Sequence, residues 1–363
     1  MLAHVVFYFL VFNIFLASFA WSQTQTLSTP NVSANVLFLY RNTDSGKEDA
    51  STLRNGFDLR ETELAFYSDV DPYHRLNILL SIHPEYTYNA TTERIDQAWK
   101  IEPEELFAES LQIPSITLKL GKFKAAVGKQ NQLHTHSFLF VEAPLINTTI
   151  MGDEGLNDTG ISAAGLLPFS WFSEITTQWL RGEGENTQFS SQATSDGVLV
   201  LHLKNLFDLN EESTFELGNS YAQGKNDLRG NTSISGLDLT YKYRPTAGGL
   251  YRSFLFGGEW LMRNLDQTGT ASEKVSGYFS FAKFQFAQRW SVLAAYDNLQ
   301  IQNSNATFNS RALANNINFR STLGVNFNST EFSAYKVEYS WGPEKKIFLQ
   351  ANFTIGAHPT HSY

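Results

Sequence analysis

The chain contains no cysteine, and only 17% of its 363 residues are charged. Soluble domains carry about 25% charged residues on average. The missing thiols exclude a disulfide scaffold, Cys-ligated zinc, iron–sulfur sites and thiol catalysis. Basic residues are scarce, since 27 Lys and Arg stand against 36 Asp and Glu, and the net charge of -9 argues against a nucleic-acid partner. The 42% content of hydrophobic residues excludes intrinsic disorder.

Long hydrophobic runs are also missing, apart from one at the N-terminus. Val5–Phe19 is almost entirely apolar, and this length suits a signal-peptide core better than a membrane-spanning helix, which needs about 20 residues. Small residues at Ala20 and Ser22 fit a cleavage site. The sequence therefore predicts a signal peptide over 1–22 and a mature domain over 23–363, with a non-cleaved anchor as the alternative. The only later window of 18 residues without Asp, Glu, Lys or Arg is 23–40, and more than half of its residues are polar or proline, so no helical span is expected there, which excludes a helical-bundle membrane protein.

The mature chain alternates apolar and polar residues with a period of two, as β-strands do. Near the C-terminus, Ile347, Leu349, Ala351 and Phe353 share one parity, and residues of the other parity are mostly polar. Strands with one apolar and one polar face fit either a β-sandwich or a barrel.

The spacing of the breaks between strands distinguishes these two architectures. Short breaks alternate with longer polar stretches along the whole chain. The short breaks are 70–72, 111–115, 168–171, 207–212, 244–250, 287–290 and 328–331, and the long stretches are 42–55, 85–94, 125–157, 182–194, 222–232, 264–273, 303–314 and 341–345. A transmembrane barrel requires this rhythm, with short periplasmic turns and long extracellular loops, whereas a Greek-key sandwich does not.

We therefore predict an all-β fold, a transmembrane antiparallel β-barrel of about sixteen strands, with 14 or 18 strands as alternatives. An even count places both termini in the periplasm. Aromatic residues near the predicted strand ends fit the girdles of such barrels; they are Trp171, Trp179, Tyr243, Tyr251, Trp290 and Trp341. The chain ends on Tyr363, and outer-membrane barrels commonly end on an aromatic residue that the barrel-assembly machinery reads. We expect a bacterial outer-membrane location, with membrane lipid and that machinery as partners.

Residues 116–145 resemble the phosphate-selective porin-like group of Gram-negative outer-membrane channels. That group has a strand ending in Gly-x-Phe-Lys, a turn of small residues, and an acidic-aromatic loop. The matching residues here are Gly121, Phe123, Lys124, Gly128, Phe140 and Glu142. Residues 152–169 and the C-terminal tail look like an uncharacterised branch of these barrels, some of which are labelled zinc-regulated outer-membrane proteins. The resemblance implies a porin, but the ladder of Arg and Lys that accompanies phosphate selectivity is missing.

The longest loop, 125–157, is the third extracellular loop in this arrangement. Loops of this length usually have a functional reason, and in porins of this size the third loop often folds inward and narrows the channel. We expect it to form the constriction or the mouth. The candidates for pore lining or constriction are Arg75, Asn77, Thr117, Lys119, Glu142, Asp153, Glu154, Lys336 and Glu338.

Two histidines in this loop, His134 and His136, form a candidate metal pair. In an extended chain both rings would point to one side, and neutral imidazoles bind zinc, copper or nickel. Glu142, Asp153 or Glu154 could supply a third ligand. Histidines with this spacing also occur as structural or solvated residues, so zinc stays an alternative, and no other cofactor is expected.

Sequence motifs of hydrolases are missing, since neither Gly-x-Ser-x-Gly nor His-Glu-x-x-His occurs. We therefore expect a non-enzymatic porin that allows passive diffusion of small hydrophilic solutes or ions. One alternative is a divalent-metal channel or binding protein of the outer membrane. Another is a closed barrel that serves as an adhesin or structural surface protein. Trimers are common among porins of this size, although the sequence does not require one.

Overall fold

The computed structural model describes residues 30–44, 55–89, 94–184, 188–190, 193, 196–247, 249, 251–266, 271–302 and 318–356. The predicted signal peptide and Tyr363 lie outside these residues. Within the described part of the chain, no helix has the length and apolar character needed to cross a membrane, a result that does not bear on crossing by strands.

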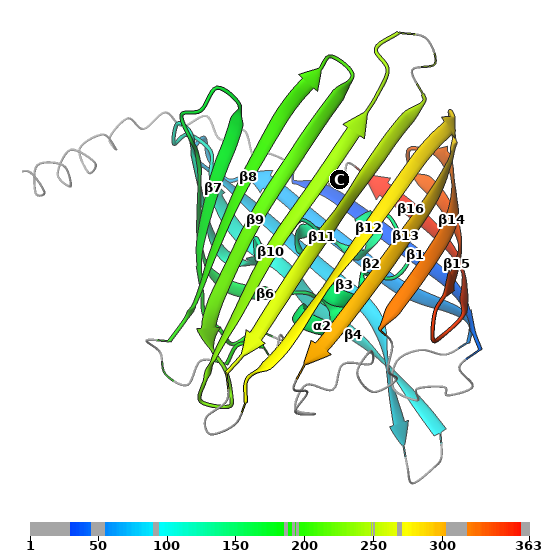
Figure 1. Ribbon diagram of the computed structural model, residues 1–363, viewed down its shortest axis with the longest axis horizontal. Helices are drawn as coiled ribbons and strands as arrows, with labels where there is room; N and C mark the ends of the chain where they lie inside the picture. Colours follow the sequence, from blue (N-terminus) through cyan, green and yellow to red (C-terminus); the bar gives the residue numbers. More distant parts are fainter. Residues whose placement is uncertain are drawn as a thin grey trace, which may run out of the picture.

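Sixteen antiparallel strands form one closed barrel in which each strand pairs with its neighbours in sequence and β1 pairs with β16 (Figure 1). The first eight are β1 (Asn31–Thr43), β2 (Gly56–Asp69), β3 (His74–Asn89), β4 (Arg94–Ser110), β5 (Ile116–Lys124), β6 (Asn157–Leu166), β7 (Phe172–Leu180) and β8 (Val198–Asn210). The other eight are β9 (Ser213–Lys225), β10 (Asn231–Tyr243), β11 (Ser253–Leu265), β12 (Glu273–Ala287), β13 (Trp290–Gln302), β14 (Phe319–Thr330), β15 (Ser333–Trp341) and β16 (Lys346–Gly356). The predicted barrel and its strand number are confirmed.

Connections alternate between the two rims of the barrel, as the sequence pattern predicts. The seven that join β2 to β3, β4 to β5, and so on to β14 and β15 form the rim of the short turns, and the other eight form the opposite rim. The longest connections, after β1, β5, β7 and β13, are all on that opposite rim. Ser33 pairs with Gly356, so the described ends of the chain lie together on the rim of the short turns.

Two of the predicted long loops are mostly strand. β3 and β4 continue to Asn89 and Arg94, so much of the predicted loop 85–94 is strand. β9 continues to Lys225 and β10 begins at Asn231, which shortens the predicted loop 222–232 to 226–230.

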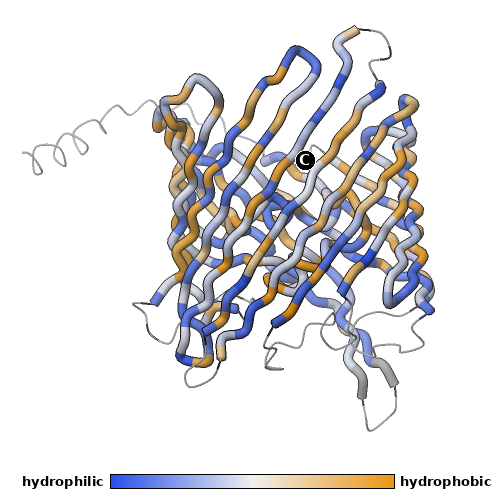
Figure 2. The backbone as a smooth tube through the Cα atoms, in the orientation of Figure 1, coloured by the Kyte–Doolittle hydropathy of each residue, from blue (hydrophilic) through white to orange (hydrophobic). Residues whose placement is uncertain are grey.

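Apolar side chains cover the outside of the wall. Leu120 and Ile161 are register partners on β5 and β6, and both are more than half exposed. Along the strands apolar and polar positions alternate (Figure 2), which is the pattern of a sheet with one lipid-compatible face and one inner face. Exposed aromatic residues occur near both rims, with Trp290 beside a short turn and Trp179 near a long loop.

Two β-bulges change the direction of charged side chains on β2 and β4. Leu37 pairs with Glu61 while Phe38 pairs with Leu59, so Arg60 is the extra residue of the first bulge. In the second bulge Glu104 is the extra residue between Pro103 and Glu105. A bulge inserts one residue and re-aims the neighbouring side chains. Consecutive residues, Arg60 with Glu61 and Glu104 with Glu105, can therefore both reach the inside of the barrel.

Candidate functional site in the barrel interior

The connection between β5 and β6, residues 125–156, lies inside the barrel; we call it the inner loop. It contains two short 3-10 turns, η1 (Gln130–Gln132) and η2 (Thr135–Ser137), and one helix, α2 (Leu145–Met151). Figure 1 shows α2 within the outline of the barrel. The loop's hydrogen bonds reach wall residues on many strands, as the following paragraphs describe, so it crosses the lumen rather than extending beyond the rim.

The first part of the inner loop is bound to the wall through backbone amides. Ala126 N donates to Gln178 Oε1 at 2.9 Å, and Gly128 N donates to Ser220 Oγ at 2.8 Å. A Cβ on Gly128, whose φ is +67°, would lie 2.4 Å from the Glu259 carboxylate. Glycine is therefore required here, which gives a physical reason for this residue of the sequence motif.

Helix α2 packs against an apolar part of the inner wall. Ile146 and Ile150 are fully buried, in one cluster with wall residues such as Leu261 of β11 and Val275 of β12. Asn147 Nδ2 donates to Glu259 Oε1 at 2.9 Å. This part of the loop is held mainly by burial of apolar surface, which is worth roughly 25 cal/mol per Å².

Acidic side chains line the wall near the loop's histidines. We call Glu61 and Glu63 of β2 with Glu104 and Glu105 of β4 the acidic sector. His134 lies between two of them, with Nδ1 2.9 Å from Glu104 and Nε2 3.1 Å from Glu105. Burial by itself would lower the pKa of His134, but these two carboxylates outweigh that effect and raise the pKa to about 10. The imidazole is therefore a cation at neutral pH in the metal-free protein.

The second loop histidine, His136, lies beside the first. Its Nδ1 is 3.1 Å from Glu63 Oε2, and the two imidazole rings are stacked with centroids 6.0 Å apart. His136 lies in the turn η2 and His134 is the extended residue just before it, so the pair does not form the extended segment that the spacing suggested. The rings nevertheless lie together, because the acidic sector binds both.

Basic side chains predominate on the neighbouring part of the wall, from β14 through β16 and β1 to β2. Arg60 of β2, Arg320 of β14, Lys336 of β15 and Lys346 of β16 form what we call the basic sector. Glu142 of the inner loop pairs with Arg320 Nη1 and Lys346 Nζ, each at 2.8 Å. Lys336 donates to the carbonyl oxygen of Phe138, and Arg60 donates to that of Val141. Glu338 accepts from Val141 N at 2.9 Å.

Among the remaining predicted site residues, Glu154 lies beside the acidic sector, because its carbonyl oxygen accepts from Lys124 Nζ at 3.2 Å and Lys124 pairs with Glu104. Arg75 pairs with Asp69 near the rim of the short turns, with Asn77 two residues further along β3. Lys119 Nζ lies 4.6 Å from the centre of the Phe107 ring, and Thr117 is exposed on the same strand. Asp153 and Glu154 are exposed at the end of the inner loop.

The predicted third metal ligand is not the residue that the structure brings to His134. Glu142 pairs with Arg320 and Lys346 instead, and the carboxylates within reach of His134 are Glu63 and Glu104. Sequence reasoning missed both, because they lie on strands far from the loop in sequence. Period-two alternation could have placed Glu61 and Glu63 inward, but the bulge that turns Glu104 has no comparable signal.

Comparison with known proteins places the fold. No family model matches the chain. An uncharacterised protein of Aquifex aeolicus (strain VF5) is 26% identical over 352 residues, covering 85% of this chain and 71% of the relative. OmpT of Vibrio cholerae in its trimer form matches with a TM-score of 0.57 at 9% identity, over 90% of this chain and 99% of that one. The anion-selective porin from Comamonas acidovorans matches with a TM-score of 0.55 at 11% identity, over 90% and 98%. The chain thus has the sixteen-stranded fold of outer-membrane porins.

Proposed function

We propose that this protein is a non-enzymatic porin of the bacterial outer membrane that passes small hydrophilic solutes or ions by passive diffusion. The observation that carries the proposal is the inner loop, which lies inside a closed barrel and is bound to wall side chains of both charges. A barrel of this size without such a loop would leave a wide aqueous channel. The inner loop would then be the constriction of the pore.

The presence of both charge signs on the wall around the inner loop supports a modest rather than a strong ion selectivity. The acidic sector and the basic sector face different parts of the same loop. Strong selection would need rings of one sign around the path. Among the constriction candidates, Glu142 of the inner loop pairs with wall cations on β14 and β16, and 22% of its side chain is exposed.

Location and assembly form part of the same proposal. The apolar outer face and the porin fold support insertion into the outer membrane, with both termini in the periplasm and the C-terminal strand read by the barrel-assembly machinery. A homotrimer is the expected assembly, because OmpT of Vibrio cholerae has this fold and a trimer form. The resemblance of residues 116–145 to the phosphate-selective porin-like group supports a porin without implying phosphate as the solute.

The chain's lack of cysteine permits a direct test in planar lipid bilayers. The mature protein is refolded, and single-channel currents are recorded for a Glu142→Cys variant before and after a negatively charged methanethiosulfonate reagent. Modification adds a bulky group where we place the constriction, so the conductance should fall. The wild type has no thiol and should not respond.

Glu331→Cys is the matched control, because Glu331 is an exposed residue of the short turn between β14 and β15. Its modification should leave the current unchanged. A conductance of Glu142→Cys that survives complete labelling would place the constriction elsewhere. A correctly folded wild type without any current would support the alternative, a closed barrel serving as an adhesin or structural surface protein.

A further inference from the structure

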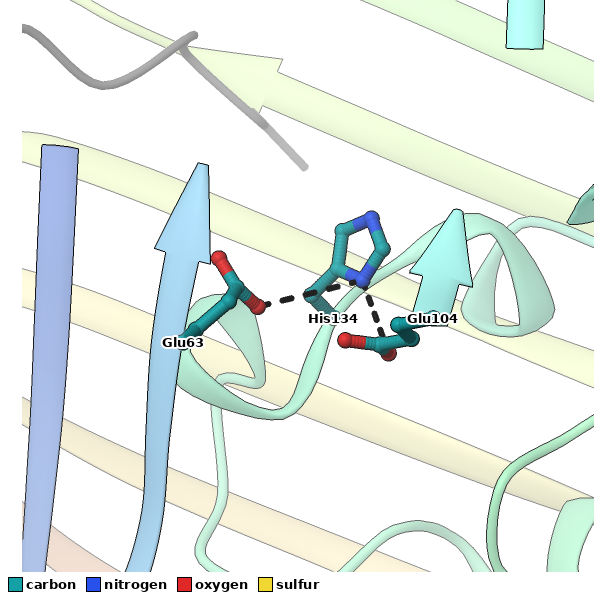
Figure 3. Close-up of side chains that lie close together, drawn as sticks. All are labelled: Glu63, Glu104 and His134. Atoms are coloured by element: carbon teal, nitrogen blue, oxygen red, sulfur yellow. Dashed lines mark ion pairs between the residues drawn. The ribbon is translucent and has the colours of Figure 1, made fainter. Parts of the chain in front are cut away.

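Three potential metal ligands from distant parts of the chain meet inside the barrel. Glu63 comes from β2, Glu104 from β4 and His134 from the inner loop, and their ligand atoms all lie within 4.8 Å of one another. The carboxylates approach the imidazole from two sides (Figure 3). His134 Nδ1 is 2.9 Å from Glu104 Oε1 and 4.0 Å from Glu63 Oε2.

The donor set selects among cations. One imidazole nitrogen and two carboxylate oxygens are ligands of Zn²⁺ and related divalent transition metals, whereas Ca²⁺ and Mg²⁺ prefer oxygen alone. Ligands of a tetrahedral Zn²⁺ at about 2.1 Å lie about 3.4 Å apart. Side-chain movements of about 1 Å would bring the three atoms to that spacing.

Electrostatics in this part of the lumen favour an added cation. The acidic sector supplies four carboxylates, with Lys124 paired to Glu104 at 3.0 Å. Glu104 is only 5% exposed, and its Oε2 has no hydrogen-bond partner within the described part of the chain. A buried carboxylate oxygen without a donor is costly, and Figure 3 shows the Glu104 carboxylate close to the same ring nitrogen of His134 that Glu63 faces.

We propose that Glu63, Glu104 and His134 form a binding site for a divalent transition-metal ion such as Zn²⁺. The ion would take the place of the proton on His134 Nδ1, since a ligating imidazole is neutral. Because the ligands come from two strands and the inner loop, the bound ion would cross-link the loop to the wall. The site does not depend on whether the barrel conducts.

The test measures metal binding directly on the full mature chain, refolded in detergent. Isothermal titration with Zn²⁺ at pH 8, where protons compete less than at neutral pH, should give one saturable site per barrel. Co²⁺ serves as a spectroscopic probe whose visible absorption reports nitrogen and oxygen ligation. Loss of an outer-shell partner commonly weakens metal binding by about 10–100-fold, so Glu104→Gln and Glu63→Gln should each weaken it by at least about tenfold.

Two control variants keep charge loss and histidine loss separate from ligand loss. Glu331→Gln removes an exposed carboxylate of the short turn between β14 and β15, outside the site. His74→Gln removes the exposed His74, which pairs with Asp71 at 3.0 Å beside a short turn. Both should retain wild-type affinity, and circular dichroism with heat-modifiable gel migration should show folded barrels throughout.

Some results would overturn the site. They are the failure of the folded wild type to bind Zn²⁺ saturably, or equal affinity in Glu104→Gln, Glu63→Gln and wild type. Because the readout is binding and not current, loss of this site would leave the porin proposal intact. A non-conducting barrel that still binds one Zn²⁺ would reject the porin and retain the site.

Discussion

Two charged contacts between the inner loop and the wall differ in their access to water. At the first contact, His134 has 1% of its side chain exposed, beside Glu104 with 4%. At the second contact, Glu142 is 22% exposed, beside Arg320 with 11%. Both contacts are ion pairs, but water reaches the second much more than the first.

This difference separates a structural role from a role in permeation. Charges removed from water are expensive, and losing one partner leaves the other unpaired. Charges that water reaches are partly screened, and they can meet a passing solute. In the proposed porin, the His134 contact would hold the loop in place, and the Glu142 contact would influence which ions pass most easily.

The largest effect should come from removing the buried cation. His134→Ala leaves Glu104 and Glu105 facing each other without the imidazolium, and loss of one member of a buried pair typically costs about 3–5 kcal/mol. Urea unfolding in lipid vesicles, with a chelator present, measures the change in the free energy of unfolding. If His134→Ala lowered the free energy of unfolding by less than Glu142→Gln does, the Glu142 contact and not the His134 contact would be the one that holds the loop.

At the Glu142 contact we expect a smaller effect on stability than for His134→Ala, but a larger effect on the current. Glu142→Gln removes one carboxylate, while Arg320 keeps Asp297 at 3.1 Å and Lys346 keeps Glu344 at 3.4 Å. Leaving charged donors with fewer partners should cost about 1–3 kcal/mol. The reversal potential in a salt gradient should move toward anions, because a negative charge leaves the constriction. An unchanged reversal potential would contradict a pore role for Glu142.

The barrel could be predicted because its signals are local and repeated. Apolar residues at every second position, such as Ile347, Leu349 and Ala351, recur along the chain, and so do the breaks between such segments. Because the signal is repeated many times, an error at one boundary does not change the predicted fold. The candidate site depends instead on which strands face the loop. His134 and Glu142 were identified from the loop's length and composition, but Glu63 is 71 positions from His134 in the printed numbering, and no local pattern joins them.

The Glu104 bulge is the clearest case of what the sequence does not contain. A strict period of two would place Glu104 on the opposite face from Glu105. The register shift inserts Glu104 as an extra residue, and both carboxylates then reach His134. Bulges are set by the fit of neighbouring strands and loops, so they become visible only once the partners are known.

The smallest effect is expected for an ion pair that lies outside the inner loop and is largely exposed to solvent. Arg75 and Asp69 lie 2.8 Å apart near the short turns, with 39% and 53% of their side chains exposed. Exposed pairs contribute about 0–1 kcal/mol, so Arg75→Gln should change the free energy of unfolding by less than ~1 kcal/mol and should leave the reversal potential near that of wild type. The same vesicle and bilayer measurements apply. A shift as large as that of Glu142→Gln would mean that ions are selected at the rim of the short turns and that the inner loop is not the selective element.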